Sequence, residues 1–288
     1  MIDAPSLPAD ASLNYRVDWS AHGSDHCVAT GWRVLPHWVV LHILEGTYHC
    51  EWRDARQQGR VSATNGEVLL VPAGMRHALT FEPGTAADGL HITFNLYHSL
   101  DVFSFYRVPW VVLDAPGVDV ADATRNLTAL LETDQGIGVG ILAARHTAAY
   151  HFLQQVLAVS SELPEREWRL FALGRLQSSL QLIEMRLERP PTIGQLAEHC
   201  ALSRNRFGEL FKMTLGVTPK QYIDQQRLNR AMSLLVHSDQ AIAEIAARLG
   251  FCDPYHFSKR FKQLTGETPS RYRCQVRKSL ALVLPVTR

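Results

Sequence analysis

Two segments near the end of the chain place apolar residues at the same helical spacing. In residues 192–216 a short apolar stretch is followed by a second one, with steps of three and four residues inside each. Residues 241–266 repeat this arrangement. The apolar positions are Ile193, Leu196, Ala197, Phe207, Leu210 and Phe211 in the first segment, and Ile242, Ile245, Ala246, Phe257 and Phe261 in the second. Each segment is therefore predicted to be a short helix, a turn and a second helix.

Residues that favour helix ends stand at the expected breaks. Thr192 and Ser203 are suited to cap the two helices of the first segment. In the second segment, Asp253 and Pro254 supply an N-cap and a first helical residue, and Gly250 can take the left-handed conformation that a turn requires. The breaks thus agree with the apolar pattern.

A single longer helix is predicted between the two segments. Residues 219–236 begin with a proline, which is harmless at the first helical position. Their apolar positions Ile223, Leu228, Ala231 and Leu235 suit a helix with one buried face. About 18 helical residues extend about 27 Å, close to the ~34 Å of one turn of duplex DNA. A connecting helix of this length can present both second helices to one face of a duplex.

Each segment ends in nearly the same phrase. Residues 211–222 read FKMTLGVTPKQY and residues 261–272 read FKQLTGETPSRY, identical at six of twelve positions. Helix, tight turn and second helix form the helix-turn-helix unit, whose second helix reads the major groove. An ordinary helical hairpin explains one copy equally well. Two copies favour a DNA-reading domain.

The first part of the chain has the pattern of strands. Runs such as WVVLHILEG, GEVLLVPAG and LHITFNL are rich in β-branched and aromatic residues and are separated by Gly, Pro and Asn, as in a small β-barrel. Helical stretches follow at residues 138–160 and 165–188, the second with a coiled-coil-like seam of barely two heptads. Either stretch, or the barrel, is a candidate dimer interface, and packing within the chain explains the same pattern.

The charge is divided between the two parts. Residues 190–288 contain 15 Lys and Arg against 7 Asp and Glu, whereas the remaining residues contain 14 against 21. A basic C-terminal part joined to an acidic N-terminal part suggests a polyanionic partner for the former. No apolar run reaches the roughly 18 residues of a membrane helix. The five scattered cysteines form no CxxC pair, so a cytoplasmic protein without a disulfide framework is expected.

These motifs resemble the DNA-binding domain of AraC/XylS-type transcription regulators. The matching residues are LA at 196–197, Ser203, FK at 211–212, G-x-TP-x-x-Y at 216–222, RL-x-x-A at 227–231, LL at 234–235, IA at 245–246, GF at 250–251, FSKRFK at 257–262 and G-x-TP-x-x-YR at 266–273. The resemblance implies a sequence-specific, double-stranded-DNA-binding regulator rather than an enzyme. It further implies an activator that responds to a small effector, forms a homodimer and contacts RNA polymerase.

Candidate DNA contacts are the exposed positions of the two second helices. They are Arg204, Asn205, Arg206, Glu209 and Lys212 on the first, and Tyr255, His256, Ser258, Lys259 and Lys262 on the second. Asn205 can pair with adenine, Glu209 can accept a hydrogen bond from cytosine, and Lys259 can donate to guanine. Lys212 and Lys262 suit phosphate contacts. Related regulators also contact bases from the position that Gly208 fills here. Because Gly208 has no side chain, less direct readout is expected from the first unit.

The strand-rich part carries a second resemblance. Residues 66–77, GEVLLVPAGMRH, fit G-x5-P-x-G-x2-H, which resembles the second signature of the cupin barrel, the usual sensor partner of this DNA-binding domain. His37 and His42 are five residues apart, so on a strand they point to opposite faces and cannot share a metal ion. Neither a metal nor another cofactor is expected.

A small-molecule pocket in the barrel is the favoured interpretation. Its candidate residues are Trp32, Arg33, Trp38, His77, His91 and Asn95, each of which could instead serve packing. Aromatic rings beside polar groups, and the family resemblance, favour a sugar-like effector.

The predicted fold class is a two-domain protein. A cupin-like β-barrel with accessory helices at 1–115 precedes a helical dimerisation and linker region at 116–189. An all-α domain at 190–275 then contains two helix-turn-helix units joined by a connecting helix, and 276–288 form a tail. Two alternatives remain: a ligand-independent DNA-binding regulator whose barrel only dimerises, and a metal-dependent cupin enzyme.

Overall fold

The chain divides into two compact units. The computed structural model describes residues 12–25, 29–54, 56–97, 100–132 and 138–281. A strand-rich unit comprises residues 15–93, 107–161 and 271–288, and a helical unit comprises residues 1–14, 94–106 and 162–270, as far as these are described. Across the described residues, every helix is too short or too polar to cross a lipid bilayer.

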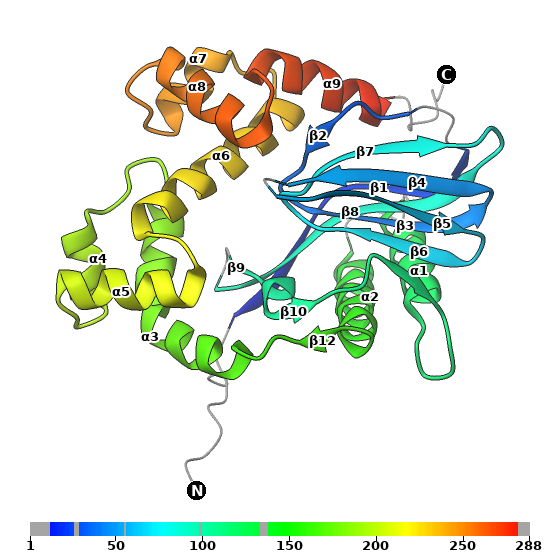
Figure 1. The fold of residues 1–288 in the computed structure, drawn as a ribbon, viewed down its shortest axis with the longest axis horizontal. Coiled ribbons are helices and arrows are strands. Elements are labelled where there is room, and N and C mark those ends of the chain that lie inside the picture. The colour runs from blue at the N-terminus through cyan, green and yellow to red at the C-terminus, as the bar shows by residue number, and fades with distance from the viewer. Residues whose placement is uncertain (1–11, 26–28, 55, 98–99, 133–137, 282–288) are drawn as a thin grey trace, which may run out of the picture. The chain divides into compact units, whose positions relative to one another are not determined.

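Two sheets form the framework of the strand-rich unit (Figure 1). The larger has the order β1-β8-β3-β6-β11, with β9 paired to β8, and the smaller has the order β2-β7-β4-β5. β5 also contacts β3, β6 and β11 of the larger sheet. The strands are β1 Leu13–Asp25, β2 Arg33–Val34, β3 Trp38–Glu45, β4 Thr47–Arg53, β5 Gln58–Thr64, β6 Glu67–Val71, β7 Arg76–Phe81, β8 Ala86–Leu96, β9 Leu100–Asp101, β10 Tyr106–Arg107, β11 Val111–Leu113 and β12 Ser161–Glu162.

Alternation of side chains places the apolar residues of these strands in a shared core. β3 is buried over most of its length, and β6 and β8 flank it with antiparallel pairing. The fully buried side chains include Tyr48 on β4 and Ile92 on β8. The predicted strand-rich N-terminal region is confirmed. Two helices accompany the sheets, α1 Val120–Glu132 and α2 Val139–Ala158, which pack on each other, and α1 also contacts β3 and β6.

The helical unit contains the two predicted helix pairs. The first pair is α4 Ile193–His199 and α5 Arg204–Leu215, and the second is α7 Ile242–Arg248 and α8 Pro254–Thr265. Helix α6, Pro219–His237, runs from one pair to the other (Figure 1). Helix α3, Arg166–Met185, precedes the first pair and contacts both α4 and α5. A short 3-10 helix, η1 Val102–Phe105, also lies in this unit, and α9, Pro269–Ala281, begins in it.

Local chemistry explains the ends of these helices. Thr192, Ser203 and Asp253 each accept a hydrogen bond from the backbone N–H three residues later, as N-caps do. Gly216 and Gly266 end α5 and α8 in the left-handed conformation, with φ of 75° and 81°. The repeated G-x-T-P phrase therefore ends each second helix with its glycine and starts the next helix at its proline.

Apolar packing inside the helical unit follows the predicted stripe. Phe207 and Phe211 on α5, and Phe257 and Phe261 on α8, are fully buried. Within each helix the two rings lie one turn apart, with centroids 5.5 Å and 5.6 Å apart. The corresponding rings in both copies show that the two pairs are built on one plan. Fully burying such a side chain stabilises the fold by roughly 2–3 kcal/mol.

Candidate nucleic-acid interface and interior polar cluster

The second helix of each pair presents its predicted contact residues to solvent. On α5, Arg204, Asn205, Arg206, Glu209 and Lys212 are exposed. On α8, Tyr255, His256, Lys259 and Lys262 are exposed and Ser258 is half-buried. The predicted sets are therefore accessible to solvent, apart from the half-buried Ser258. Whether these side chains contact bases stays a prediction.

The exposed face of α5 is partly occupied by its own contacts. Arg206 Nη1 lies 3.5 Å from Glu209 Oε2, one turn away, and both side chains are exposed. Arg204 leans on α4, because a Cβ placed on Gly194 would lie 2.8 Å from Arg204 Nη2. Gly208 leaves open space on the same helix. Arg204, Asn205 and Lys212 are then the side chains of the predicted set for which the structure describes no side-chain hydrogen bond or ion pair.

Helix α8 contains basic residues and no acidic one. Lys259 and Lys262 are exposed, and the side chain of Tyr255 is 79% exposed although tyrosine is large and amphipathic. Arg260 Nη2, by contrast, donates to Asp224 Oδ2 on α6 at 2.9 Å. A pocket of about 500 Å³ lies beside this helix, lined by Lys220, Asp224, Arg227, Gly250, Phe251, Cys252, His256 and Arg260. Its cationic lining continues the basic character of α8.

Two arginines join α3 and the residues that follow it to α5 and α6. Near the start of α3, Arg169 donates from Nε to Thr214 O in α5 and from Nη1 to Ser104 O in η1, both at 2.9 Å. Leu187 follows the C-terminal end of α3, and its carbonyl oxygen accepts a hydrogen bond from Nε of Arg227 on α6 at 3.0 Å. Burial lowers the pKa of Arg169 and of Arg227 below the usual range of arginine. These contacts join residues far apart in sequence, and the apolar pattern did not predict them.

Inside the strand-rich unit, Arg33 and His77 form a buried pair. They are register partners on β2 and β7, and Arg33 Nε donates to His77 Nε2 at 3.3 Å. His77 Nδ1 donates to Met75 O at 2.9 Å, which fixes the tautomer. Burial, and then the charge of Arg33, lower the pKa of His77 to about 3. The imidazole is therefore neutral and accepts from the guanidinium.

The other predicted pocket residues are distributed differently. His91 stacks on His37 with ring centroids 4.6 Å apart, and Trp38 is buried on β3. Trp32 lies under the guanidinium of Arg53, 4.3 Å from its ring centroid. Asn95 belongs to the helical unit, where it is the register partner of Asp101. Arg33 and His77 are thus the predicted pocket residues joined by a side-chain hydrogen bond, and ligand contact by the set stays a prediction.

A second buried polar cluster was not predicted. The carboxylate of Asp88, fully buried on β8, lies 3.0 Å from His42 Nδ1, 2.9 Å from His22 Nδ1 and 3.9 Å from Arg125 Nε of α1. His42 thus has Asp88 as its partner, whereas His37 Nδ1 lies 3.3 Å from Asp18. His37 and His42 therefore have different partners. Among the described residues, no group of His, Cys, Asp and Glu has the arrangement of a metal site.

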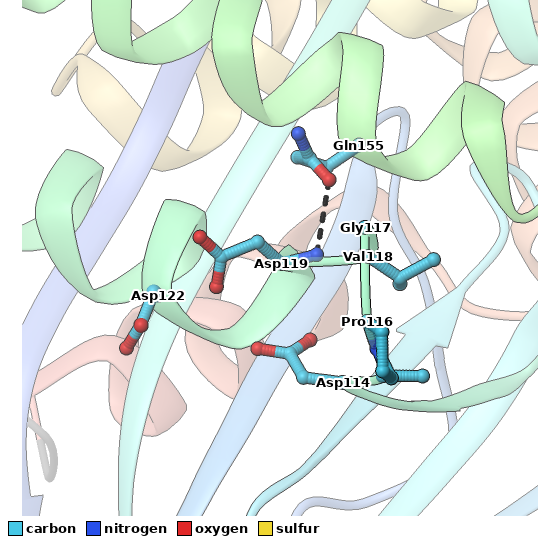
Figure 2. A pocket seen from close by; sticks show the side chains of 8 residues that line it. Asp114, Pro116, Gly117, Val118, Asp119, Asp122 and Gln155 are labelled. Carbon is cyan, nitrogen blue, oxygen red and sulfur yellow. Dashed lines mark hydrogen bonds between the residues drawn. The ribbon is translucent and has the colours of Figure 1, made fainter.

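An acidic depression occupies the surface beside α1 (Figure 2). It is lined by Asp114, Ala115, Pro116, Gly117, Val118, Asp119, Asp122 and Gln155. Asp114 accepts from the backbone N–H of Ala121 in the first turn of α1, and Gln155 accepts from the N–H of Asp119. Burial and neighbouring carboxylates raise the pKa of Asp119. These acids serve the start of a helix and would repel a nucleic acid.

Comparison with known proteins supports the reading of the C-terminal part. Residues 196–275 match a family described as "Helix-turn-helix domain". The chain is 34% identical over 103 residues to the HTH-type transcriptional regulator ArgR of Pseudomonas aeruginosa, covering 36% of this chain and 31% of that protein. It is 33% identical over 132 residues to the HTH-type transcriptional regulator AlkR of Acinetobacter baylyi, covering 45% and 43%. The chain thus spans less than half the length of these relatives. The predicted resemblance to AraC-type regulators is confirmed for the helix-turn-helix region.

Likeness over most of the chain comes from a solved structure. The crystal structure of ToxT from Vibrio cholerae O395 superimposes with a TM-score of 0.52 at 13% identity, covering 92% of this chain and 98% of that one. At this identity the likeness concerns the fold alone. It agrees with the predicted two-domain fold class, a strand-rich N-terminal part followed by a helical C-terminal part.

Proposed function

We propose that this chain, whose residues 196–275 match a helix-turn-helix domain, is a sequence-specific DNA-binding transcription regulator. Both of its helix pairs bind double-stranded DNA, with α5 and α8 in the major groove. The single observation that carries the proposal is the repetition of one plan. The two pairs share cap positions, a buried phenylalanine pair and a left-handed glycine at the end of the second helix.

The geometry of the connection supports simultaneous binding by both pairs. Helix α6 has 19 residues and therefore extends about 28 Å at 1.5 Å per residue. Its N-terminal end carries a capping box formed by Thr218 and Gln221, so the helix is defined from its first turn. A rigid connector nearly as long as a turn of duplex suits two adjacent major-groove faces. An asymmetric operator follows, because the two reading helices differ in sequence.

Two classes of contact are assigned to the exposed residues. Asn205 on α5 and Lys259 on α8 read base edges, while Lys212 and Lys262, near the C-terminal ends of the same helices, hold phosphates. Tyr255 adds an apolar face near the start of α8. The exposed Arg206–Glu209 pair contributes little to stability, so Glu209 can leave it to accept a hydrogen bond from cytosine.

The strand-rich unit is assigned the role of effector sensor. Its interior combines a buried arginine, a neutral histidine and stacked aromatic rings, the residue types that fix a small molecule in an otherwise apolar site. An effector alters DNA binding only by the difference of its affinities for two arrangements of the protein. As the family resemblance implies, the regulator is an activator, acts as a homodimer and contacts RNA polymerase.

Selection of DNA by the full-length chain tests the core of this proposal. A pool of random double-stranded fragments is bound to the protein, and the enriched sequence is measured by mobility shift over a salt series. We expect one enriched, non-palindromic pattern per protomer and an affinity that falls steeply with salt. Arg56→Ala, which removes an exposed cation from the strand-rich unit, is the charge-matched control for Lys259→Ala. Enrichment of no sequence by the folded chain would refute the proposal.

A further inference from the structure

The interior of the strand-rich unit holds a guanidinium without a carboxylate partner. Arg33 is 7% exposed, and its Nε donates to a neutral acceptor, His77 Nε2. Within the part of the chain that the structure describes, no carboxylate forms an ion pair with Arg33. Its Nη atoms are not among the fully enclosed side-chain atoms that lack a hydrogen bond there, so part of the guanidinium keeps a small exposure. A buried cation of this kind is costly unless an anion accompanies it.

Neighbouring groups do not provide that anion. Burial raises the pKa of the Cys50 thiol to about 12, and it raises the pKa of the Tyr272 hydroxyl. Both therefore remain protonated at neutral pH. The carboxylate of Asp18 lies 3.0 Å from Arg16 Nε and 3.3 Å from His37 Nδ1. It already has two basic partners.

The cluster around Arg33 is basic rather than balanced. His37 and His77 both have lowered pKa values, chiefly because of burial, and Arg33 adds to the lowering in each case. Three side chains able to carry positive charge thus share one interior region, and His77 is neutral in it. A carboxylate bound in this region would stabilise the charge of Arg33 and would raise the pKa values of His37 and His77.

A second polar group of the interior also lacks a partner. The Oγ1 atom of Thr93 is buried and has no hydrogen bond among the described residues. Thr93 follows His91 by two residues on β8, so both side chains point to the same face of the sheet. His91 stacks on His37, which feels the charge of Arg33. A polar ligand that reaches this face would give Thr93 a hydrogen-bond partner.

Aromatic side chains stand beside the basic cluster. Arg33, His77, Trp52 and Gly59 are register partners across the four strands of the smaller sheet, so they share one face. Trp52 lies over Gly59, where a Cβ would come within 2.7 Å of the indole, and stacks on Trp110 with centroids 5.4 Å apart. These four register partners therefore offer a ligand a charged group, Arg33, at one end and an aromatic ring, Trp52, toward the other.

We propose that Arg33 anchors the carboxylate of a small organic acid, which is the effector of this regulator. The inference rests on the proposed sensor role and deepens it. Guanidinium and carboxylate match in geometry, and a carboxylate satisfies the buried charge that a neutral sugar leaves uncompensated. A sugar acid meets both this requirement and the expectation of a sugar-like effector. A neutral sugar does not.

The first test needs no knowledge of the ligand. Full-length wild-type protein and Arg33→Met are heated in a buffer free of carboxylates and phosphate. Because the wild type then buries an uncompensated charge, Arg33→Met is expected to unfold about 3 °C higher. Arg53→Met, which removes the exposed guanidinium above Trp32, is the matched control, and its melting temperature is expected not to rise. A lower melting temperature for Arg33→Met than for wild type would show that Arg33 is satisfied within the chain and would overturn the proposal.

The second test uses pairs of probes that differ only in charge. Benzoate and benzamide, octanoate and octanamide, and glucuronate and glucuronamide are each added at about 10 mM, well above the ~1 mM dissociation constant expected of weak probes. At least one acid is expected to raise the melting temperature of the wild type by about 3 °C, and its amide is expected to raise it much less. Neither compound is expected to raise the melting temperature of Arg33→Met. Equal responses to acid and amide, a response that persists in Arg33→Met, or no response to any acid would each overturn the proposal.

DNA binding separates this inference from the proposed function. Arg33→Met lies outside the helical unit and is expected to bind the selected DNA in the absence of acid as wild type does. Absence of an acid response in wild-type protein that still binds the selected DNA would refute only the assignment of the effector. Absence of DNA binding by wild type would refute the regulator itself and leave the thermal tests of Arg33 standing.

Discussion

Ala201 and Gly250 occupy the same position in the two turns, and both have a positive φ, 51° and 70°. Each lies four residues after a buried alanine, Ala197 or Ala246, and in both turns the carbonyl of that alanine accepts from the residue after the positive-φ position. The same backbone conformation is therefore built once with glycine and once with a residue for which it is strained. Around Gly250 there is also no room, because an added Cβ would meet Glu188 O and Arg227.

The two turns are expected to respond oppositely to exchange of these residues. Ala201→Gly removes a backbone strain of roughly 1–2 kcal/mol but adds conformational freedom to the unfolded chain. The free energy of unfolding is therefore expected to rise by about 0.5 kcal/mol. Gly250→Ala adds strain and a backbone clash, for a loss of about 3 kcal/mol. Urea unfolding of the full chain, with hydrogen exchange to assign the transition of the helical unit, measures both. Equal losses from the two substitutions would contradict this account.

Arg227 is expected to hold the residues that follow α3 against the connecting helix α6. Its Nε and Nη2 donate to Leu187 O at 3.0 Å and Glu188 O at 3.4 Å. Arg227→Ala should destabilise the helical unit by about 2 kcal/mol, and Arg227→Lys by nearly as much, because an ammonium does not reproduce the fork of donors. Arg230→Ala, one turn away and exposed, is the matched control. The urea midpoint of the same unit measures the effect, and a lysine variant equal to wild type would count against the bidentate role.

The assignment of phosphate and base contacts predicts different salt and sequence behaviour. Lys212→Ala and Lys262→Ala should each reduce the slope of log affinity against log salt by about 1, with the preferred sequence unchanged. Lys259→Ala should relax the preference at one base pair, at a cost of about 1–3 kcal/mol. Mobility-shift titrations on the selected site and its single-base variants distinguish these outcomes. If all three variants changed only the salt slope, Lys259 would be a phosphate contact as well.

The repeated helix pairs could be predicted from sequence because their determinants are local. A cap such as Ser203, a left-handed glycine such as Gly216 and the spacing of Phe207 and Phe211 all lie within a few residues of the helix they define. Such features survive any tertiary context in which the helix packs at all. The comparisons support the same region.

Contacts between distant positions could not be predicted in this way. His42 and Asp88 are 46 residues apart, and Arg227 and Leu187 are 40 apart. Which of many polar residues meet depends on the register of the sheet and the packing of helices, which no local pattern specifies. Likewise, residue type alone put Trp32 beside Arg33 in one predicted pocket, whereas the structure gives Trp32 a contact with Arg53. Helix α1 also has no counterpart among the individually predicted helices.

His77 is expected to make stability depend on pH. Its pKa is about 3 in the folded protein against an ordinary value near 6.5, so between these values the unfolded chain binds a proton that the folded chain does not. This contribution is fully present above pH 6.5 and is lost toward acid at about 1.4 kcal/mol per pH unit. His77→Gln should flatten the dependence between pH 6 and 4, and the exposed His151→Gln serves as the control for removing an imidazole. Urea unfolding at each pH measures it, and identical curves for His77→Gln and wild type would argue against a buried neutral imidazole.

The dimer predicted from sequence is expected to use α2 rather than α3. The exposed apolar side chains of α2 include Val139 at 86% and Leu142 at 52% exposure, while α3 exposes Met185 at 82%, Phe171 at 56% and Trp168 at 44%. Helix α3 already packs against α4 and α5 in the same unit. Binding of a second protomer to α3 would therefore disturb the DNA-reading helices. Leu142→Glu should therefore convert a dimer to a monomer in sedimentation equilibrium and weaken binding to paired sites, since one protomer loses the effective concentration supplied by the other. Met185→Glu is the matched control on α3, and dissociation caused by it alone would place the interface there.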